Sequence, residues 1–158
     1  PYLNGERTPH RDPNARGVFF GISSLNNEND ILRATMEGIT FGLRDSYELI
    51  KGKTIIKDMR IVGGGAKNKT WAKIVATNFK MPVKLPEIDE GGAYGAAMLA
   101  ALGEGEKVED VLKWIKFKEI IEPNYKETEI YDNYYEIYKK IYISLKEDFA
   151  ILSKVQNS

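Results

Sequence analysis

The chain has 158 residues, of which 29% are charged and 42% are hydrophobic, and this composition indicates one folded domain rather than a disordered segment. Lysine plus arginine and aspartate plus glutamate each number 23, so the formal net charge is zero, which argues against nucleic acid or an anionic membrane as a partner. The chain has no cysteine and no apolar run of the roughly 20 residues that span a membrane, which favours a cytoplasmic protein without disulfides or thiolate metal sites.

Residues 1–26 are expected to form a loop that ends in a short strand. Proline and glycine recur through the opening "PYLNGERTPHRDPNARG", and "GVFFGI" at residues 17–22 has the composition of a β-strand. The opening has no hydrophobic face of its own, which is typical of a segment inside a longer protein.

A long helix is predicted over residues 30–50, with Asn27 or Asn29 as its N-cap. Residues three or four positions apart give this helix one apolar face, formed by Leu32, Met36, Ile39, Leu43, Tyr47 and Ile50. Gly38 and Gly42 lie one turn apart in it, each at a cost of about 1 kcal/mol in helix propensity. We expect these glycines to let another backbone approach the helix closely.

The rest of the chain alternates short strands with helices. "IIKDMRIV" predicts a buried strand that ends at Gly63, and "MPVKLP" predicts another strand between two prolines. Helices are predicted over residues 70–80, 91–103, 107–115 and 128–152, and the last has an aromatic stripe that is typical of core packing. This alternation predicts an α/β fold. Because only three or four strands are found, we expect the first strands of the domain to lie outside this chain.

The stretch "RIVGGGAKNKT" places three glycines between a predicted strand and a predicted helix, where each glycine costs roughly 0.5–1 kcal/mol relative to alanine. A P-loop and a dinucleotide fingerprint both require a glycine where Asn68 stands, although Glu87 or Asp89 lies at the distance of the fingerprint's acid. A third interpretation is a bare turn that lies flat against a nucleotide, with the next helix N-terminus offering N–H groups. A tight turn that binds nothing is the fourth.

Four segments read together resemble the C-terminal half of sugar kinases of the FGGY family. They are "PYLNGERTPHRDPNARGVFFGI", "NDILRATMEGITFGLRD", "RIVGGGAKNKTWAKIVATNF" and "EGGAYGAAMLAALGEG". The second signature of that family is matched by Gly17, Phe19, Gly21, Ile22, Asp30, Ile31, Ala34, Thr35, Met36 and Glu37. The resemblance covers residues 1 to about 105. Within the family, the opening and the "GGGA" turn point to the branch that acts on D-xylulose.

The resemblance implies the actin-like, ribonuclease-H-like ATPase fold, with residues 1–158 as the C-terminal of two domains. It also implies that Gly64 and Gly65 contact the adenosine and α-phosphate end of ATP through their backbone. Asn68 or Lys69 would lie beside the adenine, and Asn29 would contact the nucleotide from the loop before the first helix. Six small residues would form a close-packed helix at the hinge between the domains, namely Gly91, Gly92, Ala93, Gly95, Ala96 and Ala97.

The resemblance further implies transfer of the ATP γ-phosphoryl group to a sugar hydroxyl with Mg²⁺, most specifically from ATP to D-xylulose. The family's D-x-G-T phosphate loop does not occur in this sequence, and its catalytic aspartate and main sugar site are expected in the other domain. We therefore assign no catalytic residue and no metal ligand here. His10, Asp12, Asp58 and Asp89 are candidate bases, but their loop contexts favour surface or capping roles.

The isolated chain is expected to be inactive as a kinase. The alternative from another class is a non-catalytic module of the actin-like fold that binds a nucleotide or a protein. An uncovered sheet edge would also allow two copies to pair as a homodimer.

Overall fold

A computed structural model describes residues 1–88 and 91–156, and the chain forms two compact units. Residues 1–55 and 126–158 are called the helical unit, and residues 56–125 are called the sheet unit. Asp89, one of the candidate bases and candidate fingerprint acids, lies outside the described residues. Each unit is described by itself.

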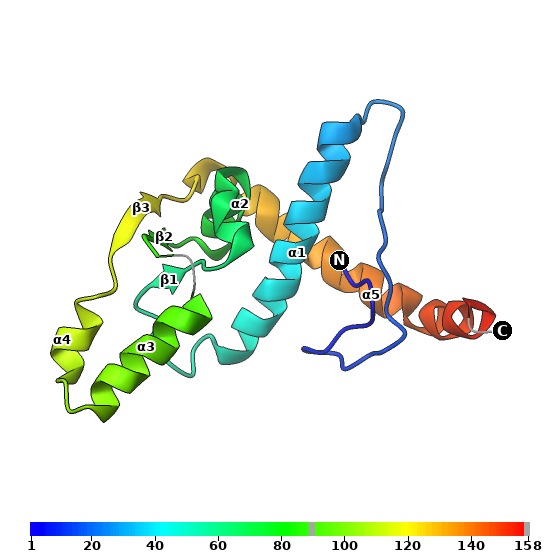
Figure 1. Cartoon of the computed structure of the whole chain (residues 1–158). Coiled ribbons are helices and arrows are strands. Elements are labelled where there is room, and N and C mark those ends of the chain that lie inside the picture. Colours follow the sequence, from blue (N-terminus) through cyan, green and yellow to red (C-terminus); the bar gives the residue numbers. More distant parts are fainter. Residues whose placement is uncertain (89–90, 157–158) are drawn as a thin grey trace. The chain divides into compact units, whose positions relative to one another are not determined.

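The helical unit is built on two long helices, α1 (Glu28–Ile50) and α5 (Thr128–Gln156), and a short 3₁₀ turn (Tyr125–Glu127) leads into α5. Figure 1 shows that α1 crosses α5. The N-terminal segment runs alongside α1 and then turns into the first residues of that helix. Of the two predicted N-cap candidates, Asn27 is the N-cap: its side chain accepts a hydrogen bond from the backbone of Asn29, and Asp30 completes a capping box.

Aromatic side chains of α5 fill the interior of the helical unit. Phe41 of α1 packs against Tyr131, Tyr135 and Tyr138 with ring centroids 5.4–6.3 Å apart. Further along α5, Tyr142 and Phe149 pack around the fully buried Ala15. The predicted aromatic core of the last helix is therefore confirmed for most of its members, whereas Tyr134 is 53% exposed.

Two predictions for the helical unit are wrong. Residues 17–22 form no strand, because none of the described residues pairs with them, and Phe20 is 72% exposed. The predicted apolar face of α1 is largely exposed, and the buried residues are instead Thr40, Phe41 and Asp45. The reason for the second error is that α5 presents tyrosine hydroxyls, so that α1 turns polar partners toward it.

The two glycines of α1 lie beside the start of the chain. A Cβ added at Gly38 or Gly42 would lie 3.7 to 3.8 Å from the Pro1 side chain, which is ordinary van der Waals contact. Among the described residues, the only backbone atom this near is the Pro1 nitrogen, 4.0 Å from the Cβ position of Gly38, so the expected close approach of another backbone is not found and a methyl group would fit at either glycine.

The sheet unit contains a three-stranded sheet in the order β1 (Met59–Arg60), β2 (Val83–Pro86) and β3 (Phe117–Ile121). β1 is parallel to β2, with Met59 opposite Val83, and β2 is antiparallel to β3, with Val83 opposite Ile121. The sequence predicted the first two strands, although the first is shorter than expected and Val62 is 56% exposed. It did not identify β3.

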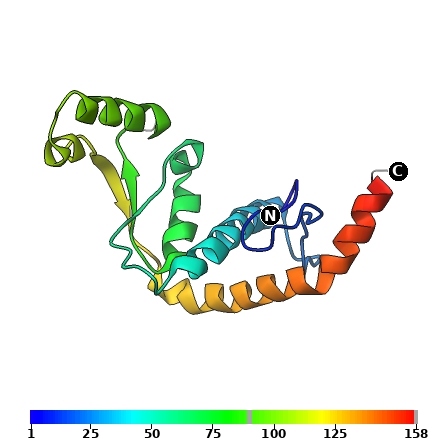
Figure 2. The ribbon, with the colours of Figure 1, turned by 90° about the horizontal axis from the view of Figure 1, so that it is seen from below.

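Helix α2 (Lys69–Phe79) covers the sheet and joins it in one aliphatic core. The core consists of Ile61, Ala66, Ala72, Val75, Ala76, Val83 and Leu85. The remaining helices are α3 (Gly91–Gly103) and α4 (Val108–Leu112). Figure 2 shows the strands between α2 on one side and the α3–α4 pair on the other. Within the described part of the chain, no helix is both long enough and apolar enough to cross a membrane.

Candidate nucleotide-binding site

The glycine stretch forms a compact turn between β1 and α2. Gly63 has a φ of +82°, a left-handed conformation that glycine adopts without steric cost, and a 3₁₀ turn follows over Gly64–Lys67. Within the turn, the Ala66 N–H donates to the Gly63 carbonyl at 2.9 Å, and the Asn68 N–H donates to the Gly65 carbonyl at 3.1 Å. Ala66 is 3% exposed and anchors the turn in the aliphatic core.

Gly64 and Gly65 have different surroundings. A Cβ added at Gly63 or Gly64 would meet nothing within 4 Å, so these residues border open space. A Cβ added at Gly65 would overlap the Trp71 indole, lying 2.9 Å from Cε3 and 3.2 Å from Cη2. The bare backbone at Gly64 is therefore accessible to a ligand, whereas the missing side chain at Gly65 makes room for a tryptophan.

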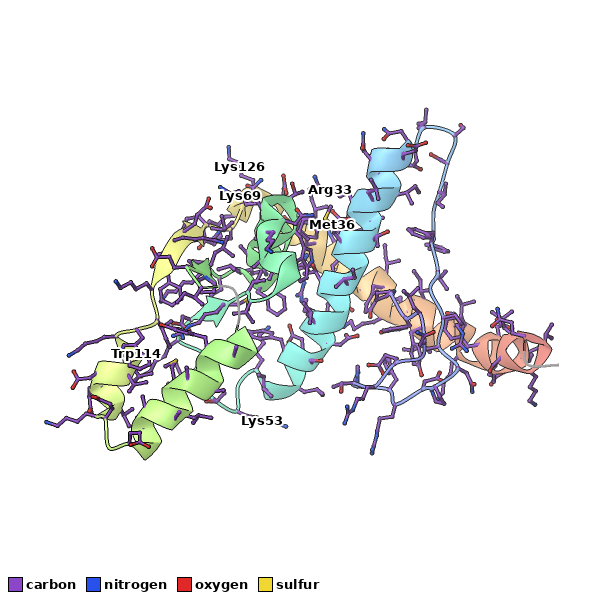
Figure 3. The ribbon with its side chains drawn as sticks, in the orientation of Figure 1. Arg33, Met36, Lys53, Lys69, Trp114 and Lys126 are labelled. Carbon is purple, nitrogen blue, oxygen red and sulfur yellow. The ribbon has the colours of Figure 1, made fainter. Side chains whose placement is uncertain are left out.

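The two polar residues at the start of α2 hold different partners. The Asn68 side-chain oxygen accepts a hydrogen bond from the Trp71 N–H at 3.0 Å and so caps the helix. Lys69, labelled in Figure 3, pairs with Glu119 of β3 at 2.9 Å, and its side chain is 70% exposed. An ion pair this exposed is weak and exchangeable, so the Lys69 ammonium can turn to an anion near the helix N-terminus.

Asn29, the remaining predicted contact, lies in the first turn of α1 in the helical unit. Its backbone N–H donates to the side chain of Asn27 at 2.9 Å. Four of the five predicted residues thus gather at one turn of the sheet unit, and the fifth belongs to the other unit.

The other candidate bases within the described residues already hold partners. Asp58 pairs with Arg60 and with Lys84, each at 3.0 Å, and the hydrogen bond from Arg60, followed by that from Lys84, lowers the pKa of this carboxyl. Asp12 accepts a hydrogen bond from the Tyr142 hydroxyl at 3.0 Å, and His10 stacks on the Tyr142 ring. Among the residues that the structure describes, no group of three or more His, Cys, Asp or Glu side chains could hold a metal ion.

A hollow of the sheet unit, with a volume of about 160 Å³, lies beside the turn. Val62, Ile88, Tyr94, Met98 and Trp114 are among its lining residues, and the Tyr94 hydroxyl donates to the Trp114 carbonyl at 2.8 Å. Its lining includes Val62, the residue before Gly63, but none of the five predicted contacts.

Sequence reasoning did not identify Trp71 or Glu119 as neighbours of the turn. The interval of six residues between Gly65 and Trp71 could have suggested that Trp71 lies near the turn. No local sequence signal indicates that Glu119 does.

The sequence profile of the C-terminal domain of the FGGY family of carbohydrate kinases matches residues 1–104. A xylulose kinase of Staphylococcus epidermidis is 38% identical over 99% of this chain, and one of Bacillus subtilis is 41% identical over 93%. The chain spans about a third of the length of these relatives, 32% and 30% respectively.

Solved structures agree with the sequence matches. A ligand-bound xylulose kinase from Lactobacillus acidophilus has a TM-score of 0.85 at 29% identity, covering 96% of this chain and 32% of that one. A glycerol kinase from Plasmodium falciparum, at 20% identity, covers 89% of this chain and 29% of that one with a TM-score of 0.75, and shares the fold. These neighbours are sugar kinases, whose fold is the actin-like ATPase fold, so the predicted fold class is confirmed. With a profile match over most of its length and an α/β structure that superposes on sugar kinases, the chain belongs to the FGGY family of carbohydrate kinases.

Proposed function

We propose that this chain is the ATP-binding part of a sugar kinase that transfers the γ-phosphoryl group of ATP to a sugar hydroxyl. The observation that carries this proposal is the open backbone of Gly64 at the entrance to α2, within a chain of the FGGY family. A second domain, outside this chain, would bind most of the sugar.

The turn suits the adenosine end of a nucleotide for two physical reasons. Because Gly63 and Gly64 carry no side chain and border open space, a flat base or ribose can lie directly against the main chain. The N-terminus of α2 adds a partial positive charge, and Lys69 adds an exposed ammonium group for a phosphate. Bound ATP would supply the transferable phosphoryl group, and Mg²⁺ would neutralise part of its negative charge.

In this mechanism the chain orients the donor and leaves proton transfer to another domain. Gly64 and Gly65 contact the nucleotide through the backbone, and Asn68 keeps the first turn of α2 in place by capping it. No carboxylate of this chain is proposed as the base. Asp58 forms ion pairs with Arg60 and Lys84, and Asp12 accepts a hydrogen bond from the Tyr142 hydroxyl. Phosphoryl transfer depends mainly on positioning and charge neutralisation, so a domain that positions ATP would be an essential part of the kinase.

D-xylulose is the proposed sugar, because the Staphylococcus epidermidis and Bacillus subtilis relatives are both xylulose kinases. Gluconate is the second candidate, because a structure described as gluconate kinase from Lactobacillus acidophilus has the same TM-score of 0.85 as the xylulose kinase from that organism. Turnover by a full-length protein that contains this chain, measured with each sugar, distinguishes the two.

Titration calorimetry of this chain with ATP tests the site. We expect Gly64→Val to weaken ATP binding by at least about tenfold, because a side chain would fill the space where the nucleotide lies. Gly103→Val is the matched control, since a Cβ there also meets nothing within 4 Å but lies at the far end of α3. Equal affinity in wild type and Gly64→Val would refute this placement of the nucleotide.

The isolated chain is expected to show no sugar phosphorylation, because the D-x-G-T phosphate loop does not occur in its sequence and the catalytic base is expected in the other domain. Turnover of ATP with D-xylulose by the chain alone would contradict this expectation. If a full-length protein containing the chain binds ATP but phosphorylates no sugar, the non-catalytic module becomes the better hypothesis.

A further inference from the structure

The contact between Gly65 and Trp71 gives the turn an inner side and an outer side. On the inner side the indole lies so close to Gly65 that even a methyl group at this position would overlap it. On the outer side Gly64 borders open space. The peptide between these two glycines is therefore backed by an aromatic ring on one side and exposed to a ligand on the other.

Trp71 is itself fixed from two directions. Its backbone N–H is held by the Asn68 side chain at 3.0 Å, within the first turn of α2. Its ring packs partly buried against the aliphatic core, which also contains Ala66 from the turn. A large planar side chain held in this way has little freedom to move away from Gly65, and packed interiors resist changes of even one methylene.

We propose that Trp71 is a positioning residue for nucleotide binding: its indole holds the backbone of Gly64 and Gly65 in the shape that accepts the nucleotide. The proposal rests on the proposed function, and it assigns the ring no direct contact with the ligand. It gives Gly65 a role that differs from that of Gly64. Gly65 is bare in order to admit Trp71, and Gly64 is bare in order to admit the nucleotide.

A first experiment examines the contact without any nucleotide. In a Trp114→Phe background, Trp71 is the only tryptophan and its emission reports its surroundings. We expect Gly65→Ala to shift the Trp71 emission to longer wavelength, because the added methyl displaces the ring toward solvent. Gly64→Ala, whose methyl enters open space, should leave the emission unchanged. Equal spectra for Gly65→Ala and Gly64→Ala would overturn the proposal.

A second experiment measures ATP affinity by calorimetry in a mutant cycle of Gly65→Ala and Trp71→Leu. Gly65→Ala should weaken binding about tenfold, and Trp71→Leu should weaken it by a comparable factor because the turn loses its backing. In the Trp71→Leu background, Gly65→Ala should have almost no further effect, because the clash has been removed. Gly64→Ala should instead have the same effect in both backgrounds.

The outcomes separate this inference from the proposed function. If wild type binds ATP and folded Trp71→Leu binds it equally well, Trp71 is only a packing residue and the inference fails alone. Strictly additive effects of Gly65→Ala and Trp71→Leu would also overturn it. If neither the wild-type chain nor a full-length protein containing it binds ATP, the proposed function fails and the inference fails with it. Melting curves of each variant show whether a loss of affinity comes from unfolding.

Discussion

The core of the sheet unit consists of aliphatic side chains, whereas the core of the helical unit contains tyrosines and a buried carboxylate. In the sheet unit, Val83 is fully buried and Leu85 is 1% exposed, and both pack under α2. In the helical unit, the buried Asp45 accepts a hydrogen bond from the Tyr135 hydroxyl at 2.6 Å. The hydroxyls of Tyr2 and Tyr138 are also paired with each other beside it.

This difference has a physical consequence for each unit. Aliphatic burial is non-directional and roughly proportional to area, so the sheet unit should respond to lost volume. A buried network of hydroxyls and a carboxylate is directional, so the helical unit should respond to the loss of a partner and to pH. The unit that carries the candidate site is thus the one whose core does not depend on titratable groups.

The largest expected effect is that of Leu85→Ala, which should reduce the free energy of unfolding of the sheet unit by about 2–5 kcal/mol. The reason is that Leu85 lies in the middle of β2 beneath α2, where a cavity would be left. Both tryptophans lie in the sheet unit, so denaturation followed by tryptophan emission reports it. Leu99→Ala, at a position 71% exposed in α3, is the control and should change little.

The next effect in size is that of Asp45→Ala, which should destabilise the helical unit by about 1–3 kcal/mol, because the buried Tyr135 hydroxyl loses its acceptor. Asp58→Ala is the matched control, since that carboxylate is partly exposed in the sheet unit and its ion pairs contribute little. Ellipticity at wavelengths of tyrosine absorption follows the helical unit, which holds seven of the nine tyrosines, and tryptophan emission follows the sheet unit, which holds Asp58. Equal losses for the two aspartate variants would remove the distinction between the units.

The sequence predicted the fold class and most elements, because α2 and α5 follow apolar periodicity and α3 is a run of small residues that ends at Gly103. It failed for the buried face of α1, because periodicity counts apolar residues and cannot recognise that the polar Thr40 and Asp45 are buried, Asp45 through its hydrogen bond from Tyr135. It failed for β3 because that strand does not alternate apolar and polar residues: the half-buried positions include Glu119, and the apolar Ile120 is 52% exposed. Strand pairing is a long-range property, which local sequence describes poorly.

For the candidate site, sequence resemblance located the turn but did not distinguish its two glycines. The distinction depends on Trp71, whose ring reaches Gly65 only because α2 begins at Lys69 and directs the side chain at its third residue back toward the turn. Spacing alone does not reveal which side of a turn is covered. The sequence likewise could not predict the partner of Lys69, because Glu119 is 50 residues away in the chain.

The comparison between the helical unit and the sheet unit can also be tested by pH, through the titration of the Tyr142 hydroxyl in the helical unit. Burial, followed by the hydrogen bond to Asp12, raises the pKa of the Tyr142 hydroxyl to about 12, and burial first of all raises the pKa of Tyr131 to about 12. A raised pKa in the fold means that the protonated tyrosine is favoured there. This contribution to stability is complete below the unfolded pKa of about 10 and is lost as the pH rises through about 12.

The helical unit should therefore lose stability between about pH 10 and pH 12. Tyr142→Phe should make this loss smaller, and at neutral pH it should cost about 0.5–1.5 kcal/mol through the lost hydrogen bond to Asp12. Tyrosinate absorbance and thermal melting measured across this pH range test both statements. An alkaline loss of the same size in Tyr142→Phe would show that this hydroxyl does not contribute to it.

The smallest expected effect is a gain in the sheet unit from Lys80→Gly. Lys80 ends α2 in the left-handed conformation, with φ 55° and ψ 33°, and its N–H donates to the carbonyls of Ala76 and Thr77. A non-glycine residue in this conformation costs about 1–2 kcal/mol, and the greater freedom of glycine in the unfolded chain offsets part of the gain. We therefore expect Lys80→Gly to stabilise the sheet unit by about 0.5–1 kcal/mol.

Lys113→Gly is the matched control for Lys80→Gly, because Lys113 also ends a helix of the sheet unit but has right-handed dihedrals of −67° and −15°. Glycine relieves no strain there and adds unfolded-state entropy, so this variant should be destabilised by a similar amount. Tryptophan emission during denaturation measures both changes against wild type. Opposite signs would show that backbone conformation, rather than loss of a surface lysine, sets the stability at the end of α2. Equal signs would contradict that explanation.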